Sequence, residues 1–112
     1  MSQSLTAATC KPCEGGVDPL TPDEAADLLT KLDGWHLSAD AKLISKSWTR
    51  ADFMDAIGFC VRVAGVAEAD GHHPDVHLTN YRDLTIDLTT HAIDGLSEND
   101  FIVAAKIDAL EK

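Results

Sequence analysis

Three of the five histidines in the chain lie within one short segment, Glu68 to His77 (EADGHHPDVH). Two of them, His72 and His73, are adjacent, and Pro74 follows them. Because free imidazole titrates near ~6.5, such a cluster can exchange protons near neutral pH, and it can also bind a metal ion. Pro74 favours extended backbone at His73, and neighbouring side chains diverge in an extended chain. The two rings are therefore better placed to approach one flat substrate from two sides than to share one ion.

The elements predicted on either side bring two further residues to this segment. A long helix predicted before it ends at Gly71, so Glu68 lies in the last helical turn. Strands predicted over residues 76–81 and 84–90 form a hairpin, and His91 ends the second strand on its polar side. A helix end, a loop and a strand end can thus gather three imidazoles and a carboxylate. Well-placed general acids and bases of these types accelerate reactions by about 10²–10⁴-fold.

The remaining pattern predicts an α+β fold. Residues 21–24, 49–52 and 97–100 carry capping signals for a first, a long and a last helix. Two short strands are predicted over residues 35–37 and 43–48. The order is helix, two strands, helix, two strands, helix. Connections of hairpin length favour a four-stranded antiparallel sheet with the helices packed on one face.

Apolar spacing predicts which faces of these elements are buried. In the long helix we expect one buried face, made of Phe53, Ile57, Cys60, Val61, Ala64 and Ala67. In the strand over residues 84–90, Leu84, Ile86 and Leu88 alternate with polar residues. This alternation predicts a sheet with one buried face and one polar face, the latter available to a site or a partner.

Composition narrows the class of protein. A chain of 112 residues with 45% hydrophobic and 25% charged residues is typical of one globular domain. Nineteen acidic and nine basic residues give a net charge of −10, which disfavours binding to nucleic acids and to anionic membranes. The first twenty residues contain no apolar run, so we expect no signal peptide and no membrane span there. Three cysteines, an odd number, favour a reducing cytoplasm.

The histidine segment and the residues after it resemble the pterin-4a-carbinolamine dehydratases. That family's signature is a glutamate followed by His-His-Pro, an aromatic residue, Thr-His, and Gly-x-Ser-x-x-Asp. The chain matches it in order with Glu68, residues 72–74, Tyr81, residues 90–91 and residues 95–100. Gly34-Trp35 and the segment over residues 53–59 are similar to landmarks further upstream.

The resemblance also implies a domain organisation. It covers roughly residues 20–112 as a single pterin-4a-carbinolamine dehydratase domain, and residues 1–19 are predicted to be a flexible N-terminal extension. Within that extension, Cys10-Lys-Pro-Cys13 followed by Glu-Gly-Gly-Val resembles an extension of bacterial and plant members. The family forms dimers and tetramers, so a homodimer or homotetramer is implied.

The resemblance implies a lyase reaction that needs no metal and no organic cofactor. Members eliminate water from 4a-hydroxytetrahydropterin and release quinonoid dihydropterin, which a reductase can recycle. The substrate is left behind by pterin-dependent aromatic amino-acid hydroxylases, so a functional link to such a hydroxylase is implied. The implied pathway is tetrahydrobiopterin recycling, in a cytoplasmic enzyme.

The resemblance also assigns roles to individual residues. His72 and His91 resemble the acid–base pair that assists departure of the 4a-hydroxyl group. His73 resembles the residue that binds and orients the pterin ring, and Glu68 is expected to fix a histidine tautomer or to contact the pterin edge. Supporting roles are implied for Pro74, Asp100 and Trp35. Asp100 also fits a capping box, and Trp35 could either belong to the core or stack on a pterin.

Other interpretations of these residues stay open. A metal site formed by Glu68, His72, His73 and His91 is the main chemical alternative. His77 is expected to lie on a strand without a role in catalysis. Cys10 and Cys13 could suggest a zinc or redox site, but no second pair of ligands with zinc-ribbon spacing follows them. The alternative function is a catalytically silent, dehydratase-like dimerisation or assembly scaffold, although relatives of that kind tend to lose the histidines.

Overall fold

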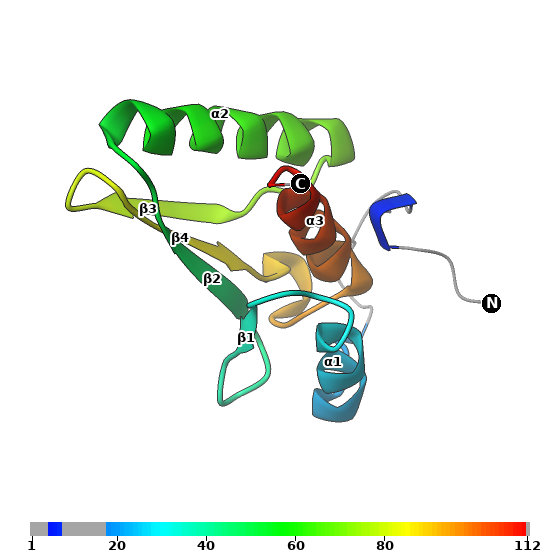
Figure 1. Cartoon of the computed structure of the whole chain (residues 1–112). Helices are drawn as coiled ribbons and strands as arrows, with labels where there is room; N and C mark the ends of the chain where they lie inside the picture. Colours follow the sequence, from blue (N-terminus) through cyan, green and yellow to red (C-terminus); the bar gives the residue numbers. More distant parts are fainter. Residues whose placement is uncertain (1–4, 8–17, 112) are drawn as a thin grey trace.

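The computed structural model describes residues 5–7 and 18–111, and the predicted α+β order is confirmed. Cys10 and Cys13 lie outside the described residues, and the boundary predicted between residues 19 and 20 stays a prediction. The elements, shown in Figure 1, are η1 (Leu5–Ala7), α1 (Pro22–Leu29), β1 (His36–Leu37), β2 (Ile44–Thr49), α2 (Phe53–Asp70), β3 (Asp75–Thr79), β4 (Asp83–Leu88), η2 (His91–Ile93) and α3 (Glu98–Ala109).

The four strands form one antiparallel sheet in the order β1-β2-β4-β3. The two longest strands, β2 and β4, lie in the centre, and β3 is an edge strand. In β4 the side chains of Leu84, Ile86 and Leu88 are buried, whereas those between them are only partly buried. The predicted alternation is therefore confirmed, and it gives the sheet one apolar face.

The helices cover that apolar face. Figure 1 shows α2 running over the sheet and α3 lying between α2 and α1, with η1 beside α3. Side chains from all three helices and from the central strands share one core. Its largest buried members are Phe59, Phe101, Ile44, Leu84, Ile86, Leu88, Leu96 and Ile107.

Several predicted boundaries differ by a few residues. Thr21 caps α1 with both hydrogen bonds of a capping box, as its sequence predicts, but the helix ends at Leu29 rather than at Gly34. The β3–β4 turn comprises residues 80–82, where Asn80 and Tyr81 adopt left-handed backbone angles. The second strand of this hairpin stops at Leu88 instead of residue 90.

Two predictions for α2 are wrong. Its N-cap is Asp52, whose side chain accepts a hydrogen bond from the Asp55 amide at 2.8 Å, because Thr49 still belongs to β2. The buried face is formed by Ala56, Phe59, Val63 and Ala67.

Most of the α2 residues that were predicted to be buried are exposed to solvent. The exposed fractions of Phe53, Ile57 and Val61 are 52%, 38% and 66%. The helix is apolar on two sides, so periodicity could not identify the side that meets the sheet. In the part of the chain that the structure describes, no helix, α2 included, combines the length and apolar character needed to cross a bilayer.

Candidate active site

The histidine segment begins where α2 ends. Gly71 adopts a left-handed backbone with φ of 65°, which glycine accommodates without strain. The amide of His72 donates to the carbonyl of Ala67 at 3.2 Å, so the chain folds back on the last helical turn. Pro74 then leads into β3, which starts at Asp75. This C-terminal cap places the two histidines between α2 and the edge of the sheet.

His72 is tied to the start of α3. Its Nε2 atom lies 2.6 Å from Oδ1 of Asp100, a fully buried carboxylate. The other oxygen of Asp100 accepts hydrogen bonds from Thr90 Oγ1 at 2.8 Å and from the Ser97 amide at 3.0 Å. The hydroxyl groups of Thr90 and Ser97 are 2.8 Å apart. Three donors and the N-terminus of a helix thus converge on one carboxylate.

This arrangement determines which ring nitrogen of His72 is available. A carboxylate can only accept, so Nε2 must carry the shared hydrogen. The lone pair of a neutral His72 ring is therefore on Nδ1. This atom accepts a proton when the ring is neutral and donates one when the ring is protonated.

His73 has a carboxylate partner of its own, but in solvent. Its Nε2 atom lies 2.7 Å from Oε1 of Glu68, and both side chains are mostly exposed. The two adjacent histidines therefore point to different partners, one on α3 and one on α2. Here too the bond leaves Nδ1 as the second ring nitrogen.

A pocket of about 130 Å³ opens beside His73 and Glu68. Its other lining residues come from α2, from β3 and from the loop between them, and they are Cys60, Val63, Ala64, Ala67, Pro74 and Val76. Burial raises the pKa of the Cys60 thiol, so this side chain is a neutral wall. Apolar walls with a few polar groups at the mouth are typical of sites for small organic ligands.

The backbone around His91 differs from the predicted one. The strand ends at Leu88, Thr90 forms an isolated bridge with Gly95, and His91 opens the short turn η2 with an exposed side chain. The amide of Thr90 donates to the carbonyl of Gly95 at 2.8 Å. Thr90 is thus held at both its backbone and its side chain, directly before His91.

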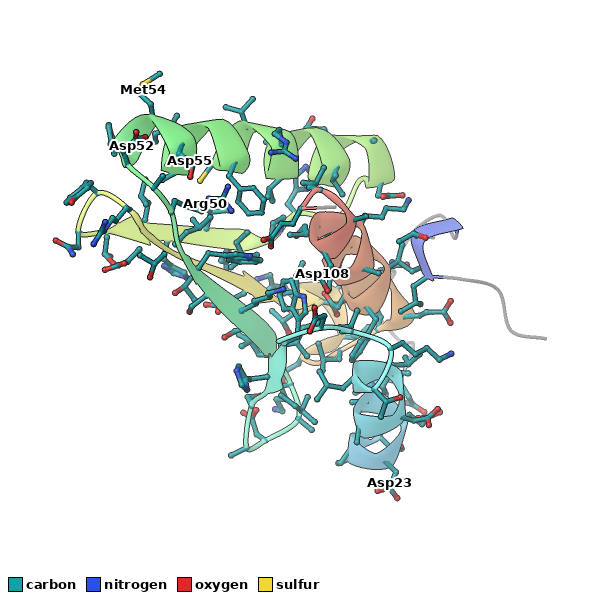
Figure 2. All side chains as sticks on the ribbon, viewed as in Figure 1. Asp23, Arg50, Asp52, Met54, Asp55 and Asp108 are labelled. Carbon is teal, nitrogen blue, oxygen red and sulfur yellow. The ribbon has the colours of Figure 1, made fainter. Side chains whose placement is uncertain are left out.

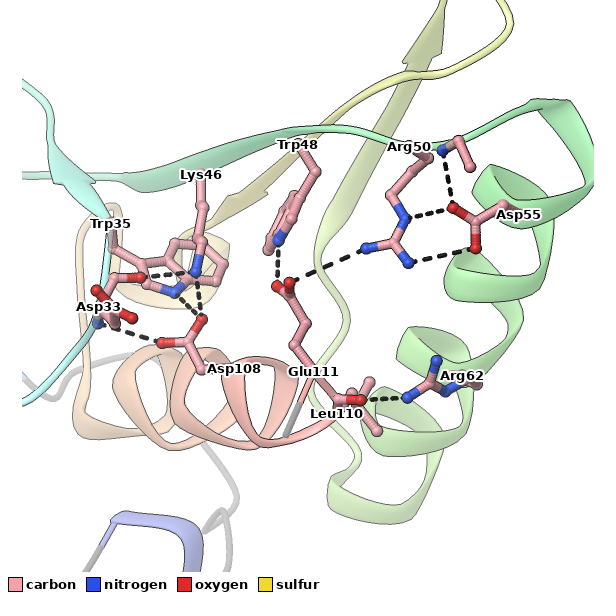
Figure 3. A network of polar contacts seen from close by, with 11 residues as sticks. Asp33, Trp35, Lys46, Trp48, Arg50, Asp55, Arg62, Asp108, Leu110 and Glu111 are labelled. Atoms are coloured by element: carbon pink, nitrogen blue, oxygen red, sulfur yellow. Dashed lines mark hydrogen bonds and ion pairs between the residues drawn. The ribbon is translucent and has the colours of Figure 1, made fainter.

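Trp35 lies elsewhere. It is buried in the core, where its Nε1 atom donates to Asp108 Oδ1 at 3.0 Å and its ring meets Trp48 edge to face. Lys46 donates to the same Asp108 oxygen at 2.9 Å (Figure 3). The supporting role of Trp35 in the site stays a prediction. Its hydrogen bond to Asp108 helps to anchor α3 to the sheet.

His77 and His36 lie on strands. His77, on β3, has its Nε2 atom 3.0 Å from Asp87 Oδ2 on the neighbouring strand β4. His36 is an exposed residue of β1. Neither is brought to Asp100 or Glu68 by the contacts that organise the other histidines.

Two contributors to the site had no role assigned from sequence. Thr90 and Ser97 belong to the family signature, but only the fold shows that both bind Asp100. The capping pattern of residues 97–100 was the available signal, since it places Asp100 at a helix N-terminus. Over residues 5–7 and 18–111, no group of three or more His, Cys, Asp or Glu side chains has an arrangement that could hold a metal ion.

Comparison with known proteins identifies the class. The family model described as "Pterin 4 alpha carbinolamine dehydratase" matches residues 18–110. A protein of Halorhodospira halophila that is named after the same family is 47% identical over 96% of this chain and 97% of its own. The mitochondrial pterin-4-alpha-carbinolamine dehydratase 2 of Arabidopsis thaliana is 43% identical over 96% of this chain and 59% of its own.

Solved structures agree in fold. The transcriptional coactivator/pterin dehydratase of Brucella melitensis superposes with a TM-score of 0.77 at 33% identity, over 85% of this chain and all of the other. A pterin dehydratase-like RuBisCO assembly factor of the alpha-carboxysome, at 20% identity and a TM-score of 0.58, shares the fold over 70% of this chain and 89% of its own. The chain belongs to the pterin-4a-carbinolamine dehydratase family, a family of hydro-lyases.

Proposed function

We propose that this protein dehydrates 4a-hydroxytetrahydropterin to quinonoid dihydropterin by histidine acid–base catalysis. The observation that carries the proposal is the pairing of His72 with the buried Asp100, in a chain of this family that holds every element of the signature. A histidine with one nitrogen fixed on a carboxylate and the other available is suited to proton transfer.

The reaction requires two proton transfers. Cleavage of the C4a–O bond needs a proton on the departing hydroxyl group, which leaves as water. Loss of the N5 proton then leaves its electron pair to form the C4a–N5 double bond. We assign these transfers to His72, acting through Nδ1, and to His91, whose exposed side chain can exchange protons with solvent.

His73 and Glu68 are assigned to binding. Glu68 accepts the Nε2 hydrogen of His73, which fixes the tautomer and presents Nδ1 to a ligand. Both residues border the apolar pocket, whose walls suit one face of a flat heterocycle. Pro74 limits the backbone freedom of His73 and lines the same pocket.

Self-association is the proposed quaternary state, as a homodimer or homotetramer. The outer side of α2 exposes Phe53, Met54, Ile57 and Val61, and Figure 2 shows Met54 pointing away from the body of the molecule. The edge strand β3 has its own exposed apolar residue, Val76. An apolar helix face beside an open sheet edge is suited to burial against a second copy.

The proposed pathway follows from the reaction, whereas the proposed location rests on the odd number of cysteines. Recycling of tetrahydrobiopterin after an aromatic amino-acid hydroxylase is the proposed physiological task, and the cytoplasm is the proposed compartment. The Arabidopsis relative is named as mitochondrial, so the compartment is not common to all relatives.

Stopped-flow absorbance of freshly generated 4a-hydroxytetrahydropterin tests the activity. We expect micromolar protein to accelerate its conversion to quinonoid dihydropterin above the uncatalysed rate. Protein treated with a chelator should be equally active, because the proposed chemistry uses side chains alone. An unchanged rate at saturating protein would contradict the proposal and would favour the silent scaffold.

A further inference from the structure

We propose that Lys106 and Asp70 form a positioning pair that holds the histidine segment against α3 for catalysis. This inference rests on the proposed dehydration reaction and adds two residues that lie outside the family signature. Lys106 lies on α3, six residues after Asp100, and Asp70 is the last residue of α2.

Lys106 and Asp70 form a bidentate ion pair, which we call the clamp. Lys106 Nζ lies 3.0 Å from Oδ1 and 2.8 Å from Oδ2 of Asp70, so one ammonium group bridges both carboxylate oxygens. The side chain of Asp70 is only 4% exposed and that of Lys106 is 23% exposed. Salt screens the attraction within such a largely buried ion pair less than it screens a surface pair. The two contacts to the carboxylate also fix the relative positions of the two side chains.

The clamp lies directly beside the turn that leads to His72. Asp70 precedes Gly71, the left-handed residue at which the chain turns, and His72 follows directly. With a rise of about 1.5 Å per helical residue, Asp100 and Lys106 lie about 9 Å apart along α3. Asp100 contacts His72 after Gly71, and Lys106 contacts Asp70 before it.

The chain is held to α3 on both sides of the turn at Gly71. The His72–Asp100 hydrogen bond holds it after the turn, and the Lys106–Asp70 pair holds it before the turn. Together the two contacts fix the direction of Nδ1 of His72. Misplacement of a catalytic group by about 1 Å can cost about 10²-fold in rate. Loss of the clamp should therefore lower kcat by more than the decrease in the folded fraction of the protein accounts for.

Three variants test the clamp. Lys106→Met keeps the aliphatic stem and removes the charge, and we expect kcat/KM to fall about 10- to 100-fold. Lys106→Arg, whose guanidinium can also bridge a carboxylate, should restore most of that loss. Because Lys106→Met takes the ammonium partner away from a buried carboxylate, the double variant Asp70→Asn, Lys106→Met removes the carboxylate charge as well and should fold while remaining slow.

A matched control lies at the other end of the same helix. Arg50 pairs with Asp55 in the first turn of α2, with Nε and Oδ2 3.1 Å apart (Figure 3). Arg50→Met should lower stability and leave kcat/KM at the wild-type value well below the melting midpoint. Amide hydrogen exchange supplies a readout besides activity: the His72 amide should exchange faster in Lys106→Met, while the Ala56 amide at the start of α2 should not.

The outcomes are distinguishable. If wild-type protein does not accelerate dehydration, the proposed function fails, and this catalytic role fails with it. If wild-type protein is active and the double variant is equally active, only the positioning role is wrong. Equal losses in Lys106→Met and Arg50→Met would likewise reduce the pair to a general stabilising contact.

Discussion

The Nε2 atom of His72 lies 2.6 Å from Oδ1 of Asp100, across an interval of 28 residues. This contact joins the end of one helix to the start of another and leaves Nδ1 of the ring for chemistry. Asp100 is in turn held by Thr90 and by the Ser97 amide. The histidine is therefore oriented by a buried network that can be dismantled one group at a time.

Replacing Asp100 with asparagine should affect activity and stability together. The amide can provide only one acceptor where the carboxylate serves three donors, so a buried donor loses its partner. We expect a stability loss of about 1–3 kcal/mol and a lower kcat, measured by urea unfolding and by stopped-flow assay. Glu98→Gln, in the same helical turn but exposed, is the control, and an Asp100→Asn enzyme with wild-type kcat would refute this orienting role.

Thr90→Val isolates the hydroxyl group. Valine has nearly the same shape but cannot donate to Asp100 Oδ2, so the carboxylate keeps its bonds to His72 and to the Ser97 amide. We expect kcat to fall several-fold with a change in folding free energy of about 1 kcal/mol. Thr90→Ser, which retains the donor, should recover the activity. If valine and serine variants behave alike, the hydroxyl group has no part in orienting His72.

Alanine replacements of the histidines should separate the proposed roles. His72→Ala and His91→Ala should each lower kcat by about 10²–10⁴-fold, the range expected for a lost general acid or base. His73→Ala should mainly raise KM, because His73 is assigned to binding. His77→Ala, which removes only the contact with Asp87, should keep wild-type kinetics. Full activity of the His72→Ala, His91→Ala double variant would exclude the mechanism.

The Arg50–Asp55 pair should give part of the stability a pH dependence. Hydrogen bonds from the Arg50 guanidinium, and then from the Ala51 amide, hold the pKa of Asp55 below its ordinary value. A carboxyl with a lowered folded-state pKa stabilises the fold above its unfolded pKa of about 3.9, and this contribution is lost as the pH falls through the folded value.

Denaturant unfolding at several pH values tests this linkage. Asp55→Asn should be less stable than wild type at neutral pH, and the difference should shrink once the pH falls below about 4. A difference that stays constant through the acid range would show that the carboxylate charge contributes nothing.

The exposed stripe of α2 predicts the effect of one added charge. Val61→Asp places a carboxylate in the middle of this stripe, where 66% of the valine is exposed in the single chain. If the stripe is buried against a second copy, the variant should sediment as a smaller species than wild type while keeping the same far-UV circular dichroism. Ala39→Asp, in the exposed β1–β2 loop, should leave the sedimentation coefficient unchanged. A monomeric wild-type protein would contradict the proposed oligomer.

Local signals identified most of the elements, because these depend on neighbouring residues. The capping pattern at Thr21 and the alternation of Leu84, Ile86 and Leu88 predicted a helix start and a half-buried strand, and both were confirmed. The limit lay in α2, where Phe59 and Val61 are equally apolar and only one of them meets the sheet. Local pattern says that a residue can be buried, but the partner surface decides whether it is.

The order of residues from Glu68 to Asp100 was by itself sufficient to identify the family and the histidines that are expected to act in catalysis. Only the tertiary structure decided how they are held, because the partners are distant in sequence. It assigned His72 to Asp100 and His73 to Glu68, moved His91 from a strand end to a short turn, and placed Trp35 in the core. Hydrogen bonds such as these require donor–acceptor distances that are correct to within a few tenths of an ångström, and those distances are set by the packing of α2 and α3 against one sheet.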